Sequence, residues 1–128
     1  MTDKNIVIIK YLENIISGWL FKSEYSTDYK DKKVVVVTMV QGDKQVLWDG
    51  IINDYFQIQI FGTSIQEEKE AATEIGNLIG EIGEVEYNEN KYAIVISQLS
   101  NPQSIMYEDI RRVGYTMTLQ TIINKIGG

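Results

Sequence analysis

Hydrophobic and polar positions along the chain follow two different periods. In residues 5–20, apolar side chains recur three to four positions apart, which predicts an amphipathic helix. Its apolar stripe consists of Ile8, Leu12, Ile15, Ile16 and Trp19. In residues 55–61, Phe56, Ile58 and Ile60 alternate with Tyr55, Gln57, Gln59 and Phe61. This period of two predicts a strand with one apolar face and one amphipathic face.

A second helix is predicted directly after the glycine that ends this strand. Ser64 and Glu67 have the spacing of a capping box, and apolar positions then recur with a helical period over residues 66–82. The apolar stripe consists of Ala71, Ile75, Leu78, Ile79 and Ile82. Further strands are predicted at residues 34–40, 46–48, 85–87, 91–99 and 107–123, with a turn at 42–44, a turn at 88–90 and a loop at 100–104.

The order of these elements indicates an α+β domain. Helices do not alternate one for one with strands, so a doubly wound parallel sheet is disfavoured. We expect one domain over residues 1–128, with a mainly antiparallel sheet and both helices packed on one of its faces. The length of 128 residues is that of one ordinary domain.

Composition excludes several kinds of chemistry. The chain has no cysteine and no histidine, so thiol catalysis, a serine triad and cysteine- or histidine-ligated metal sites are excluded. The net charge of −6 argues against a dedicated nucleic-acid binder. The apolar stretch 6–21 contains Lys10 and Glu13, and it therefore reads neither as a signal peptide nor as a membrane span. These features suggest a cytoplasmic setting without a membrane.

Charge is concentrated in residues 64–90, where eight glutamates stand against one lysine for a net charge of −7. One interpretation is a solvated helix face. Another is a contact with basic side chains of a neighbouring subunit, and a third is repulsion of an anionic polymer that slides past. Glu68 falls on the apolar side of its helix. The helix dipole stabilises a carboxylate in the first turn, which is sufficient to explain its position. The alternative is that its side chain contacts a partner subunit.

Twelve residues are therefore candidates for a subunit or partner interface. Arg111 and Arg112 either solvate a strand end or pair with carboxylates across an interface. The amphipathic face of residues 55–61 suits a partner as well as solvent. The candidates are Lys30, Lys32, Lys33, Tyr55, Gln57, Gln59, Glu67, Glu68, Glu70, Glu74, Arg111 and Arg112.

No catalytic or cofactor motif stands out. The chain has no GxGxxG, Walker A, HExxH or GxSxG sequence, and its acidic clusters lack EF-hand spacing. We expect no enzyme, no metal and no cofactor. An enzyme with dispersed carboxylates stays open as an alternative, and it requires a buried Asp or Glu with a raised pKa in a pocket.

Several features in combination resemble the tail terminator family of long-tailed bacteriophages, also known as minor capsid or tail completion proteins. They are the amphipathic first helix, the hairpin beginning at residue 34, the segment 57–62 that ends in Phe61-Gly62, the acidic helix directly after it, and an arginine followed by the long alternating stretch 112–120. The resemblance covers nearly the whole chain.

The resemblance implies a virion structural protein, assembled in the host cytoplasm and located in the tail or neck region. Its subunits would form a hexameric ring on the tail-tube protein, stop tube elongation and join the tail to the head connector. DNA would pass through the channel without specific binding. In such a ring, two different surfaces of each subunit meet, and residues 55–61 would act as an edge strand between subunits. The alternatives are another neck subunit, such as a head-tail connector or tail completion protein, and a small cytosolic protein-binding module.

Overall fold

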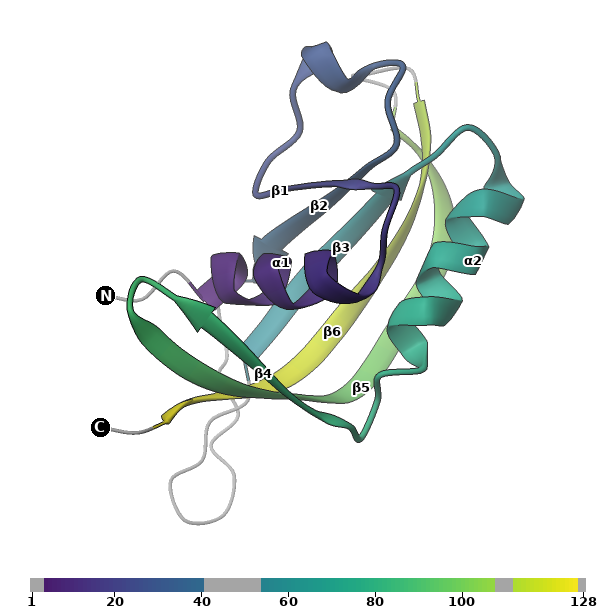
Figure 1. The fold of residues 1–128 in the computed structure, drawn as a ribbon. Helices are drawn as coiled ribbons and strands as arrows, with labels where there is room; N and C mark the ends of the chain where they lie inside the picture. Colours follow the sequence, from purple (N-terminus) through teal and green to yellow (C-terminus); the bar gives the residue numbers. More distant parts are fainter. Residues whose placement is uncertain (1–3, 41–53, 108–111, 127–128) are drawn as a thin grey trace.

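Six strands of the described chain form one sheet in the spatial order β1-β2-β3-β6-β5-β4 (Figure 1). The computed structural model describes residues 4–40, 54–107 and 112–126. The strands are β1 (Leu20–Lys22), β2 (Val34–Met39), β3 (Asp54–Phe61), β4 (Ile82–Tyr87), β5 (Asn90–Tyr107) and β6 (Arg112–Ile126). β1 runs parallel to β2, and the other neighbouring pairs are antiparallel.

The expected fold class was wrong. Strands account for 54% of the described residues, and they form a single mixed sheet that curls into a half-barrel. We expected an α+β domain with two helices on one face of a mainly antiparallel sheet. Nothing in the single chain supports a ring subunit. The hydrophobic pattern located most strands. The fold class, however, depends on the length and curvature of the strands, and a period of two in the sequence predicts neither.

The core lies on the concave, inner face of this sheet. Phe56, Ile58 and Ile60 of β3 are completely buried there, because successive side chains of a strand point to opposite faces. Neighbouring strands supply residues of the same parity to the same cluster, among them Val35, Val37, Ile94, Ile96, Met117 and Leu119. Burial of this apolar surface is the main favourable term that holds the sheet in its curled shape.

Helix α1 (Lys4–Ile15) lies across the open side of the half-barrel (Figure 1). It contacts β1 and β2 near one edge of the sheet and β4 at the other. Tyr11 lies against Gly83 of β4, where any larger side chain would collide with its ring. The helix is shorter than predicted: it ends before Gly18, which has a φ of +89°, and Leu20 already belongs to β1.

Helix α2 (Ile65–Gly76) lies beside β3 and β6 and buries Ala71 and Ile75 in the same core. The predicted cap is confirmed, since the Ser64 side chain accepts a hydrogen bond from the Glu67 N–H at 3.2 Å. The helix ends six residues earlier than predicted, and Ile82 begins β4. A short 3-10 helix, η1 (Thr27–Tyr29), interrupts the segment between β1 and β2.

Three further expectations are corrected. β3 lies between β2 and β6, so residues 55–61 are not an edge strand. Residues 100–104 belong to β5, which continues through Pro102 with a shift in register. The last strand spans 112–126 instead of 107–123. The predicted turn at 42–44 and the return strand 46–48 lie outside the described residues.

Candidate functional site

The outer, convex face of the sheet carries a row of polar side chains that neither α1 nor α2 covers. We call it the polar outer face, and it consists of Thr38, Tyr55, Gln57, Gln59, Thr116, Thr118 and Gln120. Strand register places Gln57 between Thr38 and Thr118, and Gln59 between Val36 and Thr116. Thr38 and Gln57 are exposed, and Thr116 is buried. The other four side chains of this face are half-buried. None of these side chains is charged, in a chain where charged residues make up 23%.

One end of the same convex face is covered by residues 23–33. Tyr25 and Tyr29 pack on Val34, Val36 and Phe61, and Tyr107 completes this group, which we call the outer aromatic cluster. The rings of Phe61 and Tyr107 are 5.3 Å apart, and those of Tyr25 and Phe61 are 5.0 Å apart. Gly114 lies under these rings, where an added Cβ would fall 2.7 Å from Phe61.

Arg112 fastens the 23–33 segment to the sheet. Its Nη1 donates to the carbonyl oxygen of Tyr29 at 2.8 Å, and its Nη2 donates to that of Lys32 at 2.6 Å. The guanidinium also lies 5.4 Å from the centre of the Phe61 ring. A planar fork with several donors suits two carbonyls at once. Arg112 therefore has a structural role within its own chain, whereas Arg111 lies outside the described residues.

Lys33 and Glu67 form an ion pair within the chain. Lys33 Nζ lies 3.1 Å from Glu67 Oε2 and 4.7 Å from the centre of the Trp19 ring. The N–H of Thr63 donates to Glu67 Oε1 at 2.8 Å. This hydrogen bond first, and the contact with Lys33 second, lower the pKa of Glu67. One interpretation of the charge pattern placed such a pair across two subunits, whereas Lys33 and Glu67 meet within one chain.

Glu68 is a buried carboxyl, only 2% exposed. Its Oε2 accepts a hydrogen bond from the Gly62 N–H at 2.8 Å, and its Oε1 has no hydrogen-bond partner among the described residues. Burial raises the pKa of Glu68, although the Gly62 N–H and the charge of Arg112 act in the opposite direction. A buried carboxyl with a raised pKa is one feature that the enzyme alternative requires.

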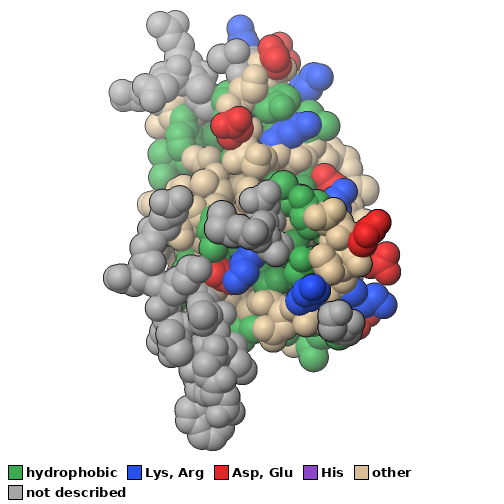
Figure 2. Space-filling view, turned by 90° about the vertical axis from the view of Figure 1, so that its left-hand side faces the viewer, with side chains coloured by type: hydrophobic (Ala, Val, Ile, Leu, Met, Phe, Trp, Pro, Cys, Tyr) green, Lys and Arg blue, Asp and Glu red, His purple; other side chains and the backbone are tan. Residues whose placement is uncertain are grey.

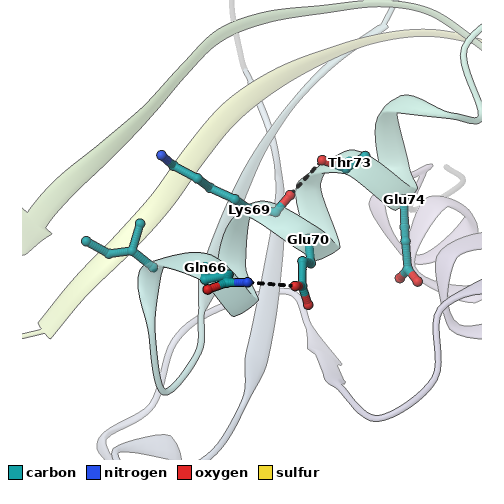
Figure 3. A pocket seen from close by; sticks show the side chains of 6 residues that line it. Gln66, Lys69, Glu70, Thr73 and Glu74 are labelled. Atoms are coloured by element: carbon teal, nitrogen blue, oxygen red, sulfur yellow. Dashed lines mark hydrogen bonds between the residues drawn. The ribbon is translucent and has the colours of Figure 1, made fainter.

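The remaining acidic candidates line the exposed side of α2. Figure 3 shows Glu70 and Glu74 pointing away from the helix axis, with Gln66 donating to Glu70 Oε1 at 3.4 Å. Together with Ile65, Lys69 and Thr73 they line a shallow, open depression. A second depression is lined by residues around Trp19 and Lys33. Glu68 lines neither, so these depressions do not supply the pocket that a catalytic carboxyl needs.

The structure describes eleven of the twelve sequence candidates, all but Arg111, and they lie in separate places. Tyr55, Gln57 and Gln59 share the outer face, Glu67 joins Lys33, and Glu70 and Glu74 stay on the helix surface. Lys30 and Lys32 have exposed side chains near η1. Figure 2 shows basic and acidic side chains interspersed over the side of the molecule that it displays, without a patch of one sign.

Sequence reasoning missed two sets of residues. The first is Tyr25 and Tyr29, which we assigned to a loop; their spacing of four in a polar segment was the available signal. The second is the ion pair between Lys4 Nζ and Asp54 Oδ2 at 2.8 Å, in which the Asp54 side chain is fully buried. No local pattern links these two residues, which are fifty positions apart.

Among the described residues, no group of three or more acidic side chains is arranged to hold a metal ion. The helices of the same part of the chain are too short or too polar to cross a bilayer. No protein-family model matches the chain, and no curated protein matches it with significance. The polar outer face is therefore assessed on its own geometry.

Proposed function

We propose that this chain is a structural protein of a bacteriophage tail that acts by binding other proteins, as tail terminators do. It would bind the tail-tube protein, stop its elongation and present a surface to the head connector. The proposal places the protein in the virion and assigns it no catalytic step. The number of copies that assemble is left to measurement, because a ring has no support in the single chain.

The polar outer face is the observation that carries this proposal. Interface cores are depleted of charged residues relative to the rest of a protein surface, and the seven side chains of the polar outer face, on three adjacent strands, are all uncharged. Arg112 lies on the same side of β6, at the end that the 23–33 segment covers. Glutamine and threonine can exchange hydrogen bonds with water for hydrogen bonds with a partner, without the desolvation cost of a charge. A rigid sheet also keeps these side chains in fixed positions, which reduces the entropy lost on binding.

Two other features agree with a binding role in a tail. The sequence resembles tail terminators over nearly its whole length, which favours the tail-tube protein as the partner. The net charge of −6 would disfavour adhesion to DNA, which has to pass a tail without being held. Neither feature identifies the partner alone, so the test uses purified tubes.

The decisive experiment is light scattering of the protein over a range of concentrations, with and without purified tail tubes. We expect binding to tube ends and an arrest of further tube-protein addition. A protein that stays monomeric and ignores tubes would contradict the proposal and would favour a small binding module.

Charge insertion tests whether the polar outer face is the surface used. Gln57→Lys combined with Gln59→Lys should abolish tube binding, because two ammonium groups would be desolvated at the contact. Gln66→Lys combined with Thr73→Lys places the same added charge on the exposed side of α2 and serves as the matched control. Equal loss in both variants, or in neither, would show that the outer face is not the binding surface.

A further inference from the structure

Strand β4 leaves one edge of the sheet unpaired. Within residues 4–40, 54–107 and 112–126 it is the last strand in the spatial order, and β5 is its only neighbour. Asn88 and Glu89, both with positive φ, form the two-residue turn that joins them, so Tyr87 and Asn90 are a hydrogen-bonded pair. The pairing of β4 with β5 has no register shift, so hydrogen-bonded and non-hydrogen-bonded pairs alternate along it. The N–H and C=O groups of Val85 and Gly83 therefore point towards β5. Those of Ile82, Glu84 and Glu86 are directed towards the open edge.

The side chains of these three residues are also available. Val85 lies in the core and Gly83 lies against Tyr11, so Ile82, Glu84 and Glu86 project from the opposite, outer face. Ile82 is 76% exposed, the largest exposure among the large hydrophobic side chains described. Register aligns it with Val95 of β5 and Ile122 of β6, which continues an apolar row from the edge into the sheet.

A second copy of this chain is a poor occupant of this edge. Antiparallel pairing of β4 with its own copy would bring Glu84 and Glu86 close to the same two carboxylates, and like charges across strands are destabilising. The other sheet edge, β1, has three residues and offers too few backbone groups for a stable ladder. Lys30 and Lys32 of a second copy lie in and beside a turn, not in an extended strand.

We propose that the β4 edge, defined by Ile82, Glu84 and Glu86, binds an extended basic segment of a partner protein as an added antiparallel strand. Main-chain hydrogen bonds would supply affinity, and the alternate side chains would supply specificity. The partner residues opposite Glu86 and Glu84 would be lysine or arginine, and the residue opposite Ile82 would be apolar. This edge is separate from the polar outer face, and binding there does not require that the protein belongs to a tail.

The probe is a seven-residue blocked peptide with lysine at its second and fourth positions, isoleucine at its sixth and threonine elsewhere. Binding to the full chain is measured by NMR, together with amide hydrogen exchange. We expect saturable binding that weakens with salt, and new protection of the amides of Ile82, Glu84 and Glu86. A peptide with glutamate in place of both lysines should bind at least about tenfold more weakly.

Two variants separate backbone pairing from charge attraction. Glu84→Pro removes an outward N–H without removing a hydrogen bond to β5, and it should abolish binding while the chain stays folded. Glu84→Lys combined with Glu86→Lys should reverse the preference in favour of the glutamate peptide. Glu70→Lys combined with Glu74→Lys, on α2, is the matched charge control and should bind as the parent does.

Three results would overturn the proposal. They are no binding of the lysine peptide, binding without protection of the β4 amides, and undiminished binding by Glu84→Pro shown to be folded by its NMR spectrum. The assay uses the isolated chain and contains no tail tubes, so its failure is distinct from failure of the proposed tail function.

Discussion

The two faces of the sheet are organised by different physical means. On the inner face, Phe56, Ile58 and Ile60 are fully buried against the helices. On the outer face, the small aromatic cluster and Arg112 cover one end, and uncharged polar side chains occupy the neighbouring part. The comparison shows that β3 contributes to both faces: its inner side chains belong to the main core, and its outer side chains belong partly to the small aromatic cluster and partly to the polar surface that we propose for binding.

The largest expected effect is on the inner face. Phe56→Ala should lower the free energy of unfolding by about 3–5 kcal/mol, because it removes a buried ring and leaves a cavity. Urea unfolding measures this. Gln57→Ala, one residue away on the outer face, is the control and should change stability by less than about 0.5 kcal/mol. Similar losses in both variants would contradict the division of roles between the faces.

The next effect concerns the link between the outer face and the 23–33 segment. Arg112→Ala should lower stability by about 1–3 kcal/mol, because the carbonyls of Tyr29 and Lys32 lose a charged donor. Arg112→Lys should restore only part of this, since one ammonium group lacks the planar fork. Limited proteolysis should then cut within residues 23–33 first. A variant as stable and as protease-resistant as the parent would rule out the fastening role.

A smaller effect is expected at Gly114. A methyl group there would meet the ring of Phe61, so Gly114→Ala should cost about 1 kcal/mol, the lower end of the range for overpacking. Combining it with Phe61→Leu should give less than the sum of the two single losses, because the shared contact is relieved. Strict additivity in a double-mutant cycle would show that the ring does not constrain this position.

The last prediction concerns the pH dependence that Glu68 adds. Its folded pKa lies above the ordinary value of 4.5, so the folded chain binds more protons than the unfolded chain between those two values. The stability that this group contributes is therefore present below 4.5 and is lost as the pH rises through the folded pKa. Glu68→Gln removes this pH-dependent contribution. The free energy of unfolding of the variant, relative to that of the parent, should therefore increase from acidic to neutral pH, as measured by urea unfolding. A constant difference would contradict the raised pKa.

Local patterns predicted the local parts of this fold. Alternation assigned Phe56, Ile58 and Ile60 to the inner face correctly, although Phe61, assigned to the amphipathic outer face, is also buried. Ser64 marked the start of α2, and the turn at Asn88 and Glu89 was recognised. Each depends on interactions within a few residues. The helical period failed at Trp19, because Gly18 turns the chain out of the helix before it.

Long-range features were beyond these patterns. The position of β3 between β2 and β6 depends on pairings that no single segment encodes. The two carbonyls that Arg112 binds, those of Tyr29 and Lys32, lie 83 and 80 positions away. The sequence therefore suggested an interface where the chain uses the residue internally. The uncharged residues of the outer face were visible in β3, but their alignment with Thr118 and Gln120 required the sheet.

The placement of α1 has a consequence for how the chain acquires its structure. This helix is synthesised before every strand of the described sheet, yet it contacts β4, whose residues 82–87 follow some seventy positions later. Until β4 has been synthesised, the apolar side chains of α1 lack part of the surface that they pack against in the folded chain. Contacts this distant in sequence slow folding, so the nascent chain is exposed to aggregation until the strand that completes its enclosure has emerged.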